Sequence, residues 1–72
     1  MRISVECYAG GRADERPTAI VVAGARMAVE KVIDAWYGED HLCFRVRVTG
    51  GDRYLVRRDD AGEWTLAQYD RA

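Results

Sequence analysis

Hydrophobic and polar residues alternate in three short runs between Leu42 and Tyr69. The runs cover residues 44–48, 53–57 and 64–66, and glycines mark the breaks between them. Period-two alternation bounded by glycine is typical of antiparallel strands that have one dry face and one wet face. The pattern therefore predicts a three-stranded meander in the second half of the chain.

The length of the first turn decides which way the arginines of this meander point, because a one-residue slip moves every side chain to the other face. If the turn is Gly50 to Asp52, three facing pairs follow: Thr49 with Arg53, Val48 with Tyr54 and Val46 with Val56. The slipped alternative pairs Val46 with Leu55 and turns two arginines toward the dry face, where unpaired charge is costly. We therefore expect four arginines to share the outer face: Arg45, Arg47, Arg53 and Arg57.

The second turn of the meander reads Asp60, Ala61 and Gly62. A three-residue hairpin loop commonly ends in the left-handed conformation, which suits Gly62. Two facing pairs follow from this turn: Val56 with Leu66, and Arg58 with Trp64.

Two further strands are predicted in the first third of the chain. Residues 2–8 alternate, with Ile3, Val5 and Cys7 on one face, and residues 18–23 are rich in β-branched side chains. Residues 10–17 are polar and contain glycine, so they predict the longest loop, and residues 23–25 predict a turn.

The segment from Arg26 to Tyr37 fits two periodicities. Four apolar residues fall at the spacing of one helix face: Val29, Val32, Ile33 and Trp36. Three of these are β-branched, however, and no N-capping residue precedes Arg26. We therefore favour a long bent strand with a bulge near Glu30 and Lys31, which would place Val29 and Val32 on the same face, and keep a helix as the alternative.

Together these elements predict an all-β fold in which five or six antiparallel strands roll into a small barrel, SH3-like or similar, with residues 1–72 as a single domain. A chain of 72 residues buries only about 60% of the surface that its unfolded form exposes, which leaves little room for a deep substrate cavity. No apolar run is long enough to span a bilayer and no signal peptide is visible, so we expect a cytoplasmic protein that does not bind membranes.

Charge is unevenly distributed although the formal net charge is only −1. Residues 45–58 hold five arginines and a single aspartate, whereas both flanking segments are acidic. Small barrels bind nucleic acid with a positive surface for phosphates and aromatic rings for bases. The candidate nucleic-acid contacts are Arg45, Arg47, Arg53, Arg57 and Tyr37. In the competing interpretation, the arginines merely pair with acidic side chains of neighbouring strands.

Catalytic and metal-binding chemistry has little support in the sequence. His41 and Cys43 lie two residues apart, and Cys7 and Asp40 could join them, but no pair has the usual Cys spacing of a zinc site. His41 stands in a charged turn rather than in a catalytic motif. We expect no enzymatic activity, no metal, no cofactor and no disulfide.

The chain resembles a family of small, uncharacterised bacterial proteins, a domain of unknown function. Four segments carry the resemblance, together with Tyr54 and Trp64: residues 3–10, 15–17, 32–38 and 44–47. It implies a compact β-rich fold without an assigned activity. Similar segments occur beside DNA-repair polymerase-like proteins, which implies a nucleic-acid setting. The chain departs from the pattern at Ile20, where the family has an aromatic residue, and at Ala35, where an arginine precedes the tryptophan.

Two functional hypotheses follow. In the first, the protein is a non-enzymatic binding module whose arginine-rich strand face contacts nucleic-acid phosphates. In the second, it is a protein-interaction or self-associating domain, a monomer or a homodimer, that uses an edge strand or an aromatic patch.

Overall fold

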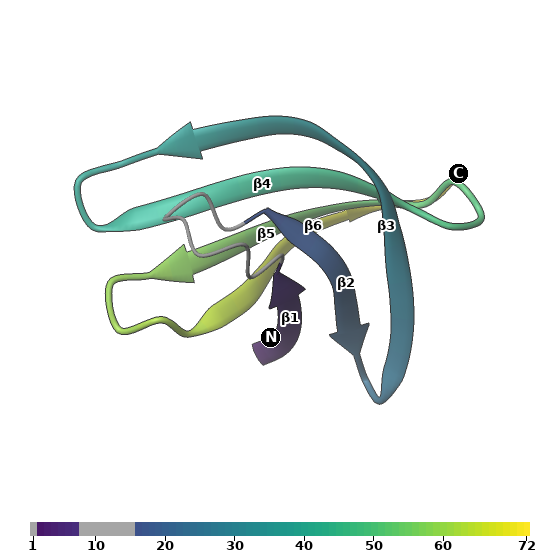
Figure 1. Ribbon diagram of the computed structural model, residues 1–72, viewed down its shortest axis with the longest axis horizontal. Coiled ribbons are helices and arrows are strands. Elements are labelled where there is room, and N and C mark those ends of the chain that lie inside the picture. Colours follow the sequence, from purple (N-terminus) through teal and green to yellow (C-terminus); the bar gives the residue numbers. More distant parts are fainter. Residues whose placement is uncertain (1, 8–15) are drawn as a thin grey trace.

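The computed structural model describes residues 2–7 and 16–72, and in this part of the chain all regular structure is β-strand (Figure 1). The described residues form six strands: β1 (Arg2–Cys7), β2 (Pro17–Val22), β3 (Ala25–Tyr37), β4 (His41–Val48), β5 (Arg53–Asp59) and β6 (Trp64–Asp70). The loop predicted at residues 10–17 lies mostly outside the described residues, as does Tyr8 at the end of the first predicted strand.

Each strand pairs antiparallel with the next, and β1 pairs with β6 to close a barrel. Among the described residues the closing seam is short, because it consists only of Arg2 opposite Thr65 and Ile3 opposite Trp64. Figure 1 shows the β3–β4 and β5–β6 turns at one end of the barrel, and the β4–β5 turn with the C-terminus at the other. The predicted all-β barrel is confirmed.

Strand β3 is the longest element and joins the two halves of the barrel. Its first residues, Ala25–Ala28, pair with β2, and the remainder pairs with β4. The register shifts between Val29 and Lys31 and again between Val32 and Asp34. The predicted bent strand and its bulge near Glu30 are therefore confirmed, the helical alternative is wrong, and a second bulge at Ile33 was not predicted.

The first bulge follows from the apolar spacing of the strand. Val29 and Val32 are three residues apart, and both pack against the core. A strand with strict period-two alternation cannot place them on one face, and one extra residue between them corrects the phase. The extra residue is Glu30, whose charged side chain stays exposed.

The core fills the inside of the barrel with apolar side chains from five strands: Ile3, Ile20, Phe44, Val46, Val48, Tyr54, Val56 and Trp64. Val46 and Val56 are fully buried at the centre. Phe44 and Trp64 pack with ring centroids 6.0 Å apart, a favourable tilted arrangement.

The two predicted hairpin registers have different outcomes. The β5–β6 pairs are confirmed, since Val56 opposes Leu66, Arg58 opposes Trp64 and Gly62 has φ 86°. The β4–β5 partners were wrong by two residues, because Val46 opposes Tyr54 and not Val56. The amide of Val48 donates to the carbonyl of Asp52 at 2.9 Å, so Asp52 belongs to the ladder and the turn is residues 49–51. A shift of two residues keeps every side chain on its predicted face.

The described part of the chain, residues 2–7 and 16–72, contains no helix long and apolar enough to cross a membrane. Among the described residues, Cys7 and Cys43 are both half-buried, and they are not joined in a disulfide.

Candidate nucleic-acid interface

The outer face of β3, β4 and β5 carries a row of cations that runs across the strands. Lys31 opposes Arg47, and Arg47 opposes Arg53 on its other side. We call these three residues the basic row. All three side chains are exposed, and like charges in directly opposed positions repel one another. The row ends at Asp70 of β6, which opposes Arg53.

A second row on the same face contains the exposed tryptophan. Trp36 of β3 opposes Cys43 of β4, which opposes Arg57 of β5. We call these residues the tryptophan row. It lies four residues along β4 from the basic row, a distance of about 13 Å at the usual rise per residue. Between the two rows, Arg45 opposes Asp34 on β3 and Leu55 on β5.

Two of the four predicted arginines have acidic neighbours on β3. Arg45 Nη1 lies 3.7 Å from Asp34 Oδ2, and Arg47 Nε lies 3.7 Å from Glu30 Oε1. Both pairs are long and have between about a third and a half of each side chain exposed, so each contributes little to stability. The Cζ atom of Arg45 also lies 5.3 Å from the ring centre of Trp36, within the range of a cation–π interaction.

The other two arginines are less engaged. Arg53 and Arg57 are exposed, and neither has an acidic oxygen within 4.0 Å in residues 2–7 and 16–72. Asp70, which faces Arg53, instead accepts hydrogen bonds from the side-chain amide of Gln68 at 3.4 and 3.5 Å. The charge of Arg57 acts only at longer range: the pKa of Asp40 is lowered, chiefly by its hydrogen bond with His41 and to a smaller extent by Arg57. These two guanidinium groups therefore keep most of their donors for a ligand.

The structure brings the four predicted arginines onto one face but places Tyr37 on the other. Tyr37 opposes Leu42, a side chain that packs against the core. Its ring is 76% exposed only because it projects from the end of the barrel, where β3 reaches the turn. The aromatic residue that shares the arginine face is its neighbour Trp36, which is 43% exposed.

Sequence reasoning missed Trp36 as a member of this face because of the second bulge. Counting by twos from Val32, which faces the core, puts Trp36 inside the barrel. The extra residue Ile33 reverses the phase and turns Trp36 outward beside Arg45. The available signal was the three-residue spacing of Lys31 and Asp34, because two charged side chains at that spacing both avoid the core only if one extra residue lies between them.

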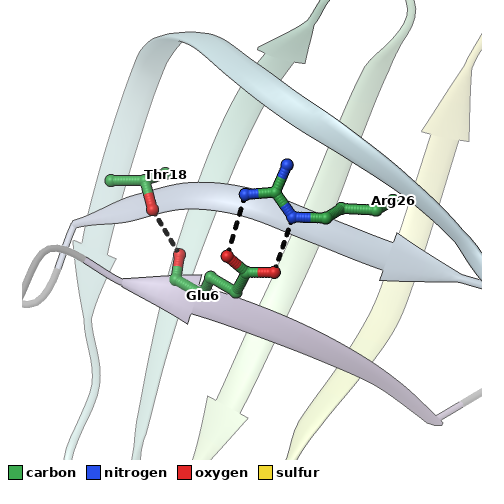
Figure 2. Close-up of polar contacts among 3 residues, drawn as sticks. All are labelled: Glu6, Thr18 and Arg26. Atoms are coloured by element: carbon green, nitrogen blue, oxygen red, sulfur yellow. Dashed lines mark hydrogen bonds and ion pairs between the residues drawn. The ribbon is translucent and has the colours of Figure 1, made fainter.

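On the other side of the barrel, an arginine is paired with a carboxylate. Arg26 of β3 donates from Nε to Glu6 Oε2 at 2.7 Å and from Nη2 to Glu6 Oε1 at 2.9 Å. Figure 2 shows these side chains meeting across β2, with Thr18 donating to the carbonyl of Glu6. The hydrogen bonds from Arg26 lower the pKa of Glu6. This bidentate geometry engages one edge of the guanidinium group, whereas Arg53 and Arg57 have no such carboxylate partner among the described residues.

A hollow of about 270 Å³ lies at the end of the barrel between the β3–β4 and β5–β6 turns. Tyr37, Leu42 and Arg58 line it together with carboxylates of both turns. His41 packs its ring against Gly38, where any Cβ would overlap the imidazole. Within residues 2–7 and 16–72, no three His, Cys, Asp or Glu side chains are arranged to hold a metal ion.

Comparisons with known protein families, curated proteins and solved structures found no match to this chain. The resemblance to a small bacterial family therefore stays a prediction, and the proposals below depend on the geometry of the barrel.

Proposed function

We propose that this barrel is a non-enzymatic, cytoplasmic module that binds the phosphate backbone of nucleic acid through the outer face of β3, β4 and β5. The observation that carries the proposal is the basic row. Lys31, Arg47 and Arg53 occupy directly opposed positions on three adjacent strands, an arrangement that weakens a sheet through repulsion. A bound polyanion would relieve that repulsion.

The charge balance of this face supports the same conclusion. Five cations lie on it, namely Lys31, Arg45, Arg47, Arg53 and Arg57, against the four carboxylates of Glu30, Asp34, Asp59 and Asp70. The chain as a whole has a formal charge of −1, so the remainder of the protein is acidic. A polyanion is therefore attracted to this face and repelled elsewhere, which orients its approach.

The test is a fluorescence-anisotropy titration of labelled oligonucleotides at several salt concentrations. Binding should weaken with salt by about 0.7 to 0.9 in the slope of log affinity against log salt for each phosphate contact. The double variant Arg47→Glu/Arg53→Glu should lose binding while its circular dichroism and NMR spectra remain those of a folded barrel.

A matched control separates this face from charge in general. Arg53→Glu and Arg16→Glu make the same change in net charge at exposed positions, but Arg16 precedes β2 and lies outside the basic row. We expect Arg53→Glu to weaken binding much more. Equal effects of the two substitutions would refute the proposal.

The second hypothesis, edge-strand pairing, has a specific but weaker basis. In the described residues, β3 beyond Val29 pairs only with β4, and β6 beyond Thr65 pairs only with β5. Both edges are bulged, however, and bulges are a common means of protecting an edge from further pairing. Sedimentation velocity at micromolar concentration tests this hypothesis, since a stable dimer would favour it over the nucleic-acid proposal.

A further inference from the structure

We infer that the ligand is a single-stranded nucleic acid. One of its bases stacks on Trp36, and the nucleic-acid backbone runs along β4 toward the basic row. This inference rests on the proposed function and names the form of nucleic acid that the face would take. Its starting point is a large aromatic side chain that the fold leaves 43% exposed on the same face as the arginines.

The indole ring of Trp36 is held in place on the surface. Arg45 lies over it at 5.3 Å, and the guanidinium of Arg45 is itself within 3.7 Å of Asp34. The ring thus has a neighbour that restrains its rotation, which lowers the entropy lost when a base stacks on it. We assign Arg45 to positioning the ring and the less engaged Arg57, in the same row as Trp36, to contacting phosphate.

The geometry favours a single strand over a duplex. In a duplex the flat faces of the bases are covered by their neighbours, whereas an unpaired strand can offer them to an aromatic side chain. The tryptophan row and the basic row are about 13 Å apart along β4. The longest dimension of the molecule is 30 Å. A short stretch of flexible backbone can follow this path with a base on Trp36 and phosphates at Arg47 and Arg53.

Two tryptophans make the inference directly measurable. Trp36 is exposed, whereas Trp64 is 9% exposed and packs against Phe44 inside the barrel. The experiment titrates the protein at low salt with a 12-residue oligo-deoxythymidine, a 12-residue oligouridine and a 12-base-pair DNA duplex. Tryptophan emission and the anisotropy of a labelled oligonucleotide are recorded together.

We expect the single strands to bind more tightly than the duplex and to quench tryptophan emission. Trp36→Ala should weaken single-strand binding roughly 5- to 150-fold, the range for loss of one base–aromatic stack. Trp36→Phe keeps a ring for stacking and should retain most of the affinity while losing the quenching, because only the buried Trp64 remains. This variant gives an answer even if Trp36→Ala fails to fold.

The matched control is Tyr37→Ala, which removes the adjacent and more exposed ring from the opposite face. It should leave affinity and quenching unchanged. Salt-sensitive binding that favours the duplex, or that is unaffected by Trp36→Ala and causes no quenching, would overturn the single-strand inference and leave the proposed function standing. Absence of anisotropy change with all three oligonucleotides would overturn both.

Discussion

The backbone conformation of the turn between β2 and β3 can be tested by substitution. Val22 opposes Ala25, so only Ala23 and Gly24 connect the two strands. Both have positive φ, 51° for Ala23 and 83° for Gly24, as in a type I′ turn. The residues best suited to this turn are Asn followed by Gly, and the chain has the glycine but not the asparagine. Ala23→Asn should therefore stabilise the barrel.

The magnitude follows from the conformation of Ala23. A left-handed backbone costs a residue with a Cβ about 1 to 2 kcal/mol, and asparagine recovers part of this because its side chain bonds locally to the backbone. We expect Ala23→Asn to raise the free energy of unfolding by about 1 kcal/mol. In a domain of this size that corresponds to a rise in Tm of roughly 4 to 8 °C.

Two comparison variants at this turn should change the stability of the barrel in different ways. Ala23→Gly removes the strain but makes the unfolded chain more flexible by a similar free energy, so its Tm should hardly change. Gly24→Ala places a Cβ where no atom lies within 4 Å, so the substitution causes no clash. Its only cost is the backbone strain of an alanine at φ 83°. It should lower the free energy of unfolding by about 1 to 2 kcal/mol.

The assay is thermal and urea denaturation followed by circular dichroism, with all three variants measured under the same conditions. The expected order of stability is Ala23→Asn, then the parent protein and Ala23→Gly together, then Gly24→Ala. If Ala23→Asn lowered Tm, or if Gly24→Ala had no effect, the turn would not have two positive φ angles and the β2–β3 register built on it would be wrong.

Three further predictions concern the core, pH and the edge of β3. Val46→Ala removes fully buried methyl groups and should reduce the free energy of unfolding by about 2 kcal/mol in urea titrations, whereas no change would mean that the site is not core. Hydrogen bonds from the Ala72 amide and the Tyr69 hydroxyl lower the pKa of Asp52, so its contribution to stability is present above the ordinary pKa of about 3.9 and is lost as pH falls through the lower folded value. Asp52→Asn should weaken the acid dependence of Tm, and an identical pH profile would contradict this assignment. Deleting Ile33 removes one bulge without changing the pairing of Trp36 with Cys43, so it should increase self-association in sedimentation velocity, and an unchanged monomer fraction would show that the bulge does not protect this edge.

The sequence predicted the fold well where glycine and alternation act together. Gly62 marked a turn whose length was unambiguous, and the facing of Val56 and Leu66 followed from it. The other hairpin was less determined, because Gly50 and Gly51 both take positive φ and nothing in the pattern shows whether Asp52 is a turn residue or a ladder residue. The loop was predicted to have an odd number of residues because an even number would bury two arginines. The arginines were therefore predicted on the correct face, although their facing partners were wrong.

The candidate site was only partly predictable, for a reason specific to β3. The four arginines lie on strands whose alternation is regular until residue 57, and their common face could be deduced. Tyr37 and Trp36 lie beyond two bulges, and each bulge exchanges the faces of all later residues. The spacing of Val29 and Val32 signalled the first bulge, but no comparable pair of buried residues signalled the second. The sequence therefore pointed to Tyr37, whereas the ring that shares a face with the arginines is that of the adjacent Trp36.

The two bulges of β3 also relate the competing hypotheses to each other. Past Val29 this strand has no ladder partner on the side away from β4 within the described residues, so it would be a ready site for another strand if its hydrogen-bonding groups were evenly spaced. The extra residues Glu30 and Ile33 interrupt that even spacing. Three charged side chains also lie along this part of the edge, those of Glu30, Lys31 and Asp34. The same Ile33 bulge turns Trp36 onto the face that carries Arg45 and Arg57. One feature thus makes pairing at the edge less favourable and places an aromatic ring among cations on the face, which suits a ligand that lies flat on the sheet better than one that extends it.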